Sequence, residues 1–343
     1  MTTTAWNPPA KFFVTPAYPT KTYDGKTVTV TGSNVGIGFE AAKHFVRLNA
    51  AKVILAVRNI SAGETAKRSI ETSIKRAGVC EVWELDLGAF DSVKALANRA
   101  SKLPRLDIVI ENAGIATYTF DISEGHECTI TVNVISTFLL GLLLLPKLKA
   151  TAKAFPTSSP RLSIVTSDVH AWTSFPERTA DNTFVALDRK ETADMQERYS
   201  TSKLLEVLVV RELATRLGDS GVILNMLTPG LCKSQLSREA GLRLRLMIFL
   251  FGRQTEVGSR TILAAAEADW DSHGAYMLDG KVNNGVLSTL VQSEAGLEAQ
   301  QKCGRNWEKS WRRSSQGSQL PCKLLRDLVC KVLTRLSLFG LAT

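Results

Sequence analysis

A tyrosine and a lysine stand four residues apart in Tyr199-Ser200-Thr201-Ser202-Lys203, and a helical pattern of apolar residues follows them. On a helix, side chains at this spacing share one face. An ammonium near a phenol stabilises the phenolate and lowers a pKa that begins near 10. Tyr199 would then act as general acid in a carbonyl reduction, or as general base in an alcohol oxidation. Because such pairs also occur by chance on helix surfaces, the surrounding motifs must decide the interpretation.

A glycine-rich run, Thr31-Gly32-Ser33-Asn34-Val35-Gly36-Ile37-Gly38, follows a β-branched stretch and precedes a helical pattern. A strand that turns through glycines into a helix brings backbone N–H groups and the positive end of the helix dipole together, which suits a pyrophosphate. Gly32 would permit the tight turn, Gly36 the close approach of the phosphates, and Gly38 the packing of the helix on the strand. The alternative is an ordinary tight loop.

The second predicted strand ends in Ala56-Val57-Arg58-Asn59, where folds that prefer NAD usually carry Asp or Glu. A cation at this place favours NADP(H) over NAD(H), because a guanidinium can hold the 2′-phosphate through charge-assisted hydrogen bonds. The alternative is that Arg58 is a solvated loop residue.

The elements that must position these residues alternate between short β-branched runs and longer amphipathic stretches. This alternation predicts an α/β fold, a Rossmann-type doubly wound parallel sheet with helices on both faces, in a single domain. The predicted strands span residues 26–31, 52–57, 80–85, 106–110, 161–166, 221–227 and 275–279, and the predicted helices span residues 36–49, 61–77, 89–102, 124–149, 196–217 and 255–268.

Three segments follow from this pattern: an N-terminal arm (1–23), a catalytic domain (24–301) and a basic, partly helical C-terminal extension (302–343). Within the domain, residues 151–160 are predicted to be a turn-rich loop, and residues 170–198 and 231–252 are predicted to be substrate loops. An apolar substrate is expected, unless these side chains only cover the sheet, because the loops carry Trp172, Phe175, Phe184, Leu236, Leu242, Leu246, Met247, Phe249 and Phe251.

Composition excludes several other classes of protein. With 44% apolar and 22% charged residues, the chain of 343 residues is not disordered or fibrous. Six scattered cysteines without a C-x-x-C pair and four scattered histidines predict neither a disulfide framework nor a metal site. No secretory signal is recognisable, and the apolar window at residues 138–145 is too short to span a bilayer, so a cytoplasmic protein is expected.

The net charge of +9 is concentrated at the C-terminal end. Residues 302–343 hold nine cations and two anions, a net of +7, which leaves 33 − 31 = +2 for residues 1–301. An excess of cations that is confined to the tail does not predict a groove that binds nucleic acid. Apolar residues recur at helical spacing over residues 324–336, which predicts a basic amphipathic helix. Such a helix docks on the body or on a membrane surface, or it is an extension without function.

Residues 24–285 resemble the short-chain dehydrogenase/reductases. Residues 31–38 look like the family's T-G-x-x-x-G-I-G loop, and Asp86 looks like its adenine-contacting acid. Asn112-Ala113-Gly114 looks like the end of the family's N-N-A-G motif, from which Glu111 departs. Pro229-Gly230-Leu231-Cys232-Lys233-Ser234 resembles the segment that wraps the nicotinamide, with Cys232 and Ser234 as conservative departures.

The resemblance implies a role for each candidate site residue. Ser167, preferred over Thr166, would hydrogen-bond the substrate oxygen, and Asn133 would hold a water that links Lys203 to solvent. Lys203 would also hold the nicotinamide ribose, and hydride would pass directly between nicotinamide and substrate without a metal. The implied cofactor contacts are Gly32, Asn34, Gly36, Ile37, Gly38, Arg58, Asp86, Asn112, Tyr199, Lys203, Cys232 and Ser234.

The opening Trp6-Asn7-Pro8 and the Glu111 variant are similar to fungal members of natural-product pathways and to retinol-dehydrogenase-like relatives. The resemblance implies a ketone or secondary alcohol on a terpenoid, polyketide or meroterpenoid skeleton. The alternative is a cofactor-binding Rossmann module that regulates a partner without catalysis. Two arrangements stay open for the apolar stretch 137–145: burial in a homodimer, as is common in the family, or packing on the sheet of its own chain.

Overall fold

The structure, a computed structural model, describes residues 14–234, 236 and 242–314. Its centre is an eight-stranded sheet in the order β3-β2-β1-β4-β7-β8-β9-β10, parallel except for β10. The strands are β1 (Thr27–Thr31), β2 (Lys52–Val57), β3 (Cys80–Glu84), β4 (Ile108–Glu111), β7 (Arg161–Val165), β8 (Ile223–Thr228), β9 (Tyr276–Leu278) and β10 (Lys281–Val282). A small separate hairpin pairs β5 (Ile122–Ser123) with β6 (His126–Glu127).

The first seven strands in the main sheet match the predicted ones to within about two residues, which confirms the predicted fold class. The order of the strands reverses between β1 and β4, because the chain leaves β3 and returns to the other side of β1. In open α/β sheets such a switch point opens a crevice at the carboxyl ends of the strands, where ligands bind.

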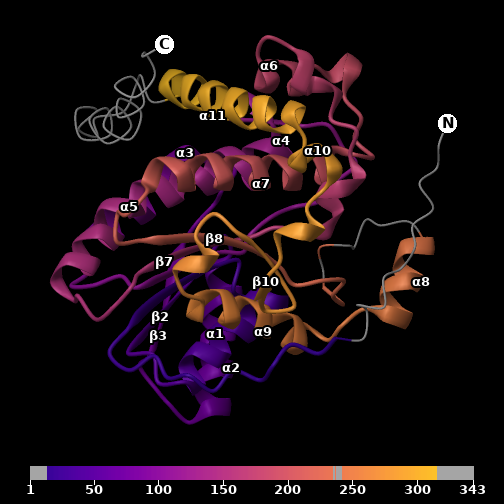
Figure 1. The fold of residues 1–343 in the computed structure, drawn as a ribbon. Helices are drawn as coiled ribbons and strands as arrows, with labels where there is room; N and C mark the ends of the chain where they lie inside the picture. The colour runs from indigo at the N-terminus through magenta and orange to yellow at the C-terminus, as the bar shows by residue number, and fades with distance from the viewer. Residues whose placement is uncertain (1–13, 235, 237–241, 315–343) are drawn as a thin grey trace.

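Helices cover both faces of the sheet (Figure 1). One face carries α3 (Phe90–Ser101), α5 (Thr137–Ala154) and α7 (Arg198–Leu217), and the other carries α1 (Gly36–Arg47), α2 (Ile60–Ile74) and α9 (Thr255–Glu267). The shorter or outlying helices are α4 (Cys128–Ile130), the π-helix η2 (Thr131–Ser136), α6 (Thr183–Leu187), α8 (Leu242–Phe251), α10 (Thr289–Gln292) and α11 (Glu294–Ser314), and the 3-10 turns are η3 (Asp168–Trp172), η4 (Pro176–Thr179), η5 (Lys190–Thr192), η7 (Trp270–Ser272) and η8 (Asn284–Val286).

The helical segment Cys128–Ala154, formed by α4, η2 and α5, is long and apolar enough to cross a membrane, but 89% of its apolar window is buried inside this chain. Within the stretch 137–145 only Leu143 is partly exposed. Packing on the chain's own sheet and helices therefore accounts for the apolar stretch, which removes the argument for a homodimer interface. The helix also continues past Pro146 to Ala154, so the predicted turn-rich loop at 151–160 begins four residues too early.

The predicted substrate loop 170–198 folds into short helices rather than an irregular loop. Phe175 and Phe184 are fully buried in the core, so they do not line a substrate mouth. Four other apolar residues of the two loops are exposed: Trp172, Leu236, Phe249 and Phe251. Met247 is partly buried, and the side chains of Leu242 and Leu246 lie outside the described part.

The predicted boundary at residue 301 falls inside α11, which packs along α7 and α6 (Figure 1). Ala299, Cys303 and Asn306 are buried on both sides of the boundary. Lys302 Nζ donates hydrogen bonds to the carbonyl oxygens of Arg178 and Ala180. The folded body therefore extends into the predicted extension, while the amphipathic pattern over residues 324–336 lies outside the described residues.

The described part of the N-terminal arm, residues 14–23, lies against α1 and α9. Tyr23 is buried at its end. Three arginine side chains donate hydrogen bonds to backbone carbonyl oxygens of the arm, Arg253 to Val14, Arg260 to Pro16 and Arg47 to Pro19.

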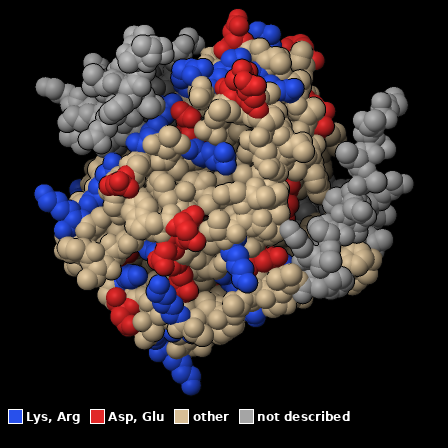
Figure 2. Space-filling model, viewed as in Figure 1, with Lys and Arg blue, Asp and Glu red and all other residues tan. Residues whose placement is uncertain are grey.

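Charged side chains of both signs are interspersed on the face shown in Figure 2. Over residues 1–301, cations exceed anions by two.

The packing of α11 predicts that the same substitution has very different effects on thermal stability at two of its positions. Ala299→Asp places a charge where the side chain is 4% exposed, whereas Leu297→Asp places it where the side chain is 50% exposed. Burial of an unpaired carboxylate is strongly destabilising, so we expect Ala299→Asp to lower the melting temperature by roughly 5 °C or more. Thermal unfolding measures this, with Leu297→Asp as the matched control. Equal melting temperatures for the two variants would contradict the docking of α11.

Candidate active site

The glycine-rich loop is fastened to the end of β4. Thr31 Oγ1 accepts hydrogen bonds from the backbone N–H groups of Asn112 and Ala113, both at 2.9 Å. The Asn112 side-chain Nδ2 donates in return to the Thr31 carbonyl oxygen at 2.8 Å. These contacts join the two strands at the switch point, so Asn112 steadies the predicted cofactor site.

Glycine is required in this loop for two separate reasons. Gly32 and Gly36 have φ angles of +63° and +66°, which residues with a side chain rarely adopt. A Cβ at Gly38 would lie 2.5 Å from Asn112 Nδ2 and 2.7 Å from the Gly32 carbonyl oxygen. Helix α1 then begins without a side-chain cap and without an acidic residue in its first turn. Its first N–H groups are therefore available to an anion, and the loop fits a dinucleotide pyrophosphate.

The other predicted cofactor residues also lie at the carboxyl edge of the sheet or beside it. Asn34 and Ile37 belong to the glycine-rich loop and the first turn of α1. Arg58 follows β2, is exposed, and makes no hydrogen bond or ion pair with the rest of the described chain. Asp86 follows β3, and its Oδ1 accepts a hydrogen bond from the Gly88 N–H at 2.8 Å.

Cys232 and Ser234 follow β8 in the segment 229–234. The Cys232 thiol is buried, donates to the Pro229 carbonyl oxygen at 3.4 Å, and has a pKa that burial raises to about 12. It is therefore an inert packing group, which agrees with a conservative departure from the family's segment. The Ser234 N–H donates to the Cys232 carbonyl oxygen at 2.9 Å.

Arg253 fixes this segment, a role that sequence reasoning missed. Its guanidinium donates to the Pro229 carbonyl oxygen at 3.3 Å and pairs with Asp279 Oδ1 at 2.6 Å. Its backbone N–H donates to the Leu231 carbonyl oxygen at 2.8 Å. No motif signals this residue, because its partners lie more than twenty residues away in the sequence.

Three of the four predicted catalytic residues meet where β7 ends and α7 begins. Lys203 Nζ lies 5.6 Å from the centre of the Tyr199 ring and donates to the Val165 carbonyl oxygen at 3.0 Å. Ser167 lies two residues after the end of β7, and its hydroxyl lies close enough to the Tyr199 phenol to lower the pKa of that phenol. Thr166 is instead buried, with its hydroxyl donating to the Lys203 carbonyl oxygen at 3.1 Å. This arrangement favours Ser167 over Thr166 as the group that faces a substrate.

Asn133, the fourth residue, lies in the π-helix η2. Its Oδ1 accepts from the Ile115 N–H at 2.8 Å, and its Nδ2 donates to the Ile115 carbonyl oxygen and to Ser202 Oγ, both at 2.9 Å. Ser202 Oγ in turn donates to the Tyr199 carbonyl oxygen at 2.7 Å. Asn133 therefore ties the loop after β4 to the first turn of α7. π-Helical turns often occur at functional sites.

The electrostatics of Tyr199 differ from the expectation drawn from its neighbour Lys203. Burial raises the pKa of the Tyr199 phenol above its ordinary value; Lys203 and the Ser167 hydroxyl lower it, and Glu206 raises it. The net shift is upward, so the predicted lowering is wrong for the protein without cofactor. Sequence reasoning failed here because it considered Lys203 alone, whereas loss of solvent and a second charge outweigh the lysine.

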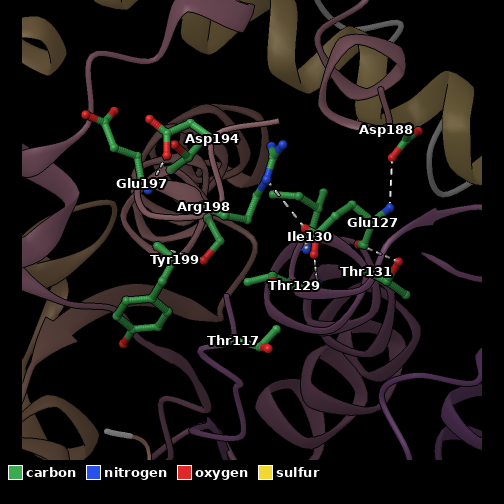
Figure 3. A network of polar contacts seen from close by, with 12 residues as sticks. Thr117, Glu127, Thr129, Ile130, Thr131, Asp188, Asp194, Glu197, Arg198 and Tyr199 are labelled. Atoms are coloured by element: carbon green, nitrogen blue, oxygen red, sulfur yellow. Dashed lines mark hydrogen bonds and ion pairs between the residues drawn. The ribbon is translucent and has the colours of Figure 1, made fainter. Parts of the chain in front are cut away.

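A buried ion-pair network holds the beginning of α7 (Figure 3). Arg198 is 1% exposed, with its Nε 3.7 Å from Glu127 Oε2 and its Nη1 3.6 Å from Glu177 Oε1. Figure 3 shows the ring of Tyr199 pointing away from the Arg198 side chain. The Glu127 carboxylate also caps α4, accepting from the N–H groups of Thr129 and Ile130. Arg198 therefore links the start of α7 to the start of α4.

The same network reaches into the segment between β7 and α7. Asp188 accepts from the Glu127 N–H at 2.9 Å and pairs with His126 Nδ1 at 2.7 Å. Asp194 accepts from the N–H groups of Gln196 and Glu197 just before the helix. Sequence reasoning missed Arg198 and Glu127. The only signal was the position of Arg198 directly before Tyr199.

Comparison with known proteins assigns the chain to a family. The family model described as short chain dehydrogenase matches residues 26–155. A short chain dehydrogenase of Emericella nidulans is 48% identical over 299 residues, 84% of this chain and 93% of that protein. A short chain dehydrogenase/reductase of Cryptosporiopsis sp. is 46% identical over 302 residues, 85% of this chain and 92% of that protein. The chain therefore belongs to the short-chain dehydrogenase/reductase family.

Solved structures support the fold. A crystal structure of a Mycobacterium paratuberculosis protein shares 26% identity with a TM-score of 0.62, covering 84% of this chain and 96% of that one. The NADPH-bound carbonyl reductase from chicken fatty liver shares 20% identity with a TM-score of 0.55, covering 77% of this chain and 99% of that one. The latter likeness concerns the fold alone.

The network around Arg198 generates a prediction about stability. Arg198→Met leaves the Glu127 carboxylate buried without its cation, which should lower the free energy of unfolding by about 3–5 kcal/mol. Denaturant unfolding measures the loss. Arg211→Met on the same helix is the matched control, because Arg211 is partly exposed and makes a single hydrogen bond to Gln300 at 3.2 Å. Equal losses in the two variants would show that the network does not hold the helix.

Proposed function

We propose that this protein is an NADP(H)-dependent oxidoreductase that interconverts a ketone and a secondary alcohol on an apolar natural product. The observation that carries the proposal is the convergence of Ser167, Tyr199 and Lys203 at the end of β7. They lie at the carboxyl edge of the same sheet whose β1 ends in the glycine cradle. A proton donor, a hydroxyl and a cation beside a dinucleotide site suit hydride transfer to or from a carbonyl carbon.

Each residue has a separate task in the proposed reaction. The nicotinamide, when bound, supplies or accepts the hydride. Ser167 holds and polarises the substrate oxygen, and Tyr199 Oη exchanges a proton with that oxygen. Lys203 holds the cofactor ribose and influences the phenol by its charge. Asn133 fixes the start of α7 relative to the loop after β4, so that the phenol keeps its place.

The preference for NADP(H) is proposed from Arg58. This side chain is exposed just after β2, has no ionic partner among the described residues, and would be available to a 2′-phosphate. The residues expected to bind the cofactor are those of the glycine-rich loop together with Arg58, Asp86, Asn112, Cys232 and Ser234.

The substrate class is proposed from two observations. The two curated relatives described above are fungal short-chain dehydrogenases. In the predicted substrate loops Trp172, Phe249 and Phe251 are 49%, 70% and 54% exposed, which leaves large apolar surfaces available to an apolar skeleton. A ring ketone or secondary alcohol on a terpenoid, polyketide or meroterpenoid is therefore the proposed substrate.

Replacement of the phenol tests the proposed reaction. Tyr199→Phe removes the group that exchanges the proton, so NADPH oxidation with a ketone that the native protein reduces should fall by about 10²-fold or more. A panel of cyclic ketones identifies such a substrate, and absorbance of NADPH follows the rate. Affinity for NADPH, measured by fluorescence titration, should stay nearly unchanged. Activity that survives Tyr199→Phe would exclude this mechanism, and a panel without any turnover would favour a regulatory module.

The cofactor preference is tested at Arg58. Arg58→Ala removes the cation offered to the 2′-phosphate, so KM for NADPH should rise about tenfold or more while KM for NADH changes little. Arg68→Ala is the matched control, because Arg68 is an exposed arginine of the neighbouring helix α2, where it donates to Thr65. An equal effect of Arg58→Ala on both cofactors would contradict this role.

A further inference from the structure

Glu206 is a buried carboxylate in direct contact with the proposed catalytic lysine. Its Oε1 lies 2.8 Å from Lys203 Nζ, and the side chains are 3% and 6% exposed. Glu206 follows Lys203 by three residues, so both lie on one face of α7. Its other oxygen, Oε2, is buried without a hydrogen-bond partner. Within the described residues, Lys203 is thus the only cation that the Glu206 carboxylate contacts.

Few charged groups surround this pair. Among the described residues, the charge that acts on Glu206 is that of Lys203, and the hydroxyl of Thr166 at the end of β7 is its other polar neighbour. Lys203 in turn is influenced by Glu206 and Tyr199 and donates to the Val165 carbonyl oxygen. Tyr199 is influenced by Lys203, Glu206 and the Ser167 hydroxyl. Lys203, Glu206 and Tyr199 therefore form one small electrostatic unit.

The carboxylate changes what the lysine does to the phenol. A buried ammonium by itself favours the phenolate, the form that acts as a base. A carboxylate at 2.8 Å cancels much of that field, so removal of a proton from the Lys203–Tyr199 pair becomes harder. Burial raises the pKa of Glu206 to about 7, against the attraction of Lys203. At the alkaline pH where a phenol titrates, Glu206 is therefore ionised and exerts this effect.

We propose that Glu206 is a positioning residue that neutralises the Lys203 ammonium, keeps the proton on the Tyr199 phenol, and so adapts the site to the reduction of carbonyl compounds. The inference rests on the proposed function and assigns the direction of the proposed reaction, which is reduction. In that direction the carbonyl carbon gains a hydride from NADPH, which is oxidised to NADP⁺. The carbonyl oxygen gains the proton of Tyr199 Oη, and the phenolate afterwards recovers a proton from water.

The pH dependence of reduction tests the proposal. Reduction needs both Tyr199 and Lys203 protonated, so kcat/KM for the ketone falls at alkaline pH when the pair loses a proton. Glu206→Gln keeps the size of the side chain and removes its charge. We expect the alkaline limb of the profile to move down by about one pH unit or more in this variant. Glu206→Asp, which keeps the charge, should leave the limb near its native position.

A second measurement does not depend on turnover. The ultraviolet absorbance of tyrosinate, taken as the difference between the native protein and its Tyr199→Phe variant, reports the titration of Tyr199 directly. In the native protein without cofactor its midpoint should lie above the ordinary value of about 10. A midpoint below that value overturns the proposal, and it does so even if Glu206→Gln does not fold or no substrate is found.

The matched control is Glu212→Gln, on the same helix. Glu212 is also buried, but it pairs with Arg216 Nε at 2.8 Å and accepts from Gln300, away from the catalytic lysine. The Glu212→Gln variant should leave the alkaline limb of the pH profile in place. If Glu206→Gln matched the native profile, or lowered the rate equally at every pH in a folded protein, Glu206 would be structural only and the proposal would fail. Absence of turnover in the native protein contradicts the proposed function instead.

Discussion

The burial of α7 between the sheet and α11 is the constraint on which the site depends. Sixteen of its twenty residues are buried, and three of these, Arg198, Lys203 and Glu206, are ionisable groups of its first half. A helix enclosed on nearly all sides must find partners for such groups within the protein. Arg198 meets Glu127 and Glu177, and Lys203 meets Glu206. Tyr199 therefore has its position and its electrostatic environment set by the interior.

The sequence predicted those parts of the fold that depend on residues close together in the chain. Runs of β-branched residues predicted the strands to within a few residues. The glycine-rich run predicted the phosphate-binding loop, and two of its glycines have positive φ angles in the structure. Ser167 was found because it comes just after a recognisable strand, and Tyr199 and Lys203 were found because they stand four residues apart at the start of a recognisable helix. Their meeting at the end of β7 then follows from the order of a doubly wound sheet.

The features that escaped prediction depend on distant contacts. The direction of the Tyr199 pKa shift required knowledge of its burial and of Glu206, neither of which follows from a tyrosine–lysine spacing. Helix α11 is strongly polar in composition, and its few buried positions, such as Cys303, are identified only once α7 is in place. Phe175 and Phe184 were taken for a substrate mouth because an apolar side chain in a loop gives no sign of which side it faces.

A second buried carboxyl lies beside the cofactor loop. Glu111 ends β4, directly before Asn112, and burial raises its pKa to about 8, partly offset by the Thr31 hydroxyl. Burial therefore favours the uncharged form of Glu111, the form most similar to the amide that the family has at this place. With Glu206 it gives the interior two carboxyl groups whose charge changes near neutrality.

The N-terminal arm has a consequence for the order of folding. Its carbonyl oxygen at Val14 is bound by Arg253, 239 residues later, and that at Pro16 by Arg260, 244 residues later. At synthesis rates of about 5–20 residues per second, the ribosome needs roughly 12–50 s to supply these partners. These contacts of the arm cannot form before their partners are synthesised, and the guanidinium of Arg253 that binds the arm also holds Pro229 and Asp279. The arm can therefore dock only once Arg253 is present, and the same arginine fixes the segment proposed to enclose the nicotinamide.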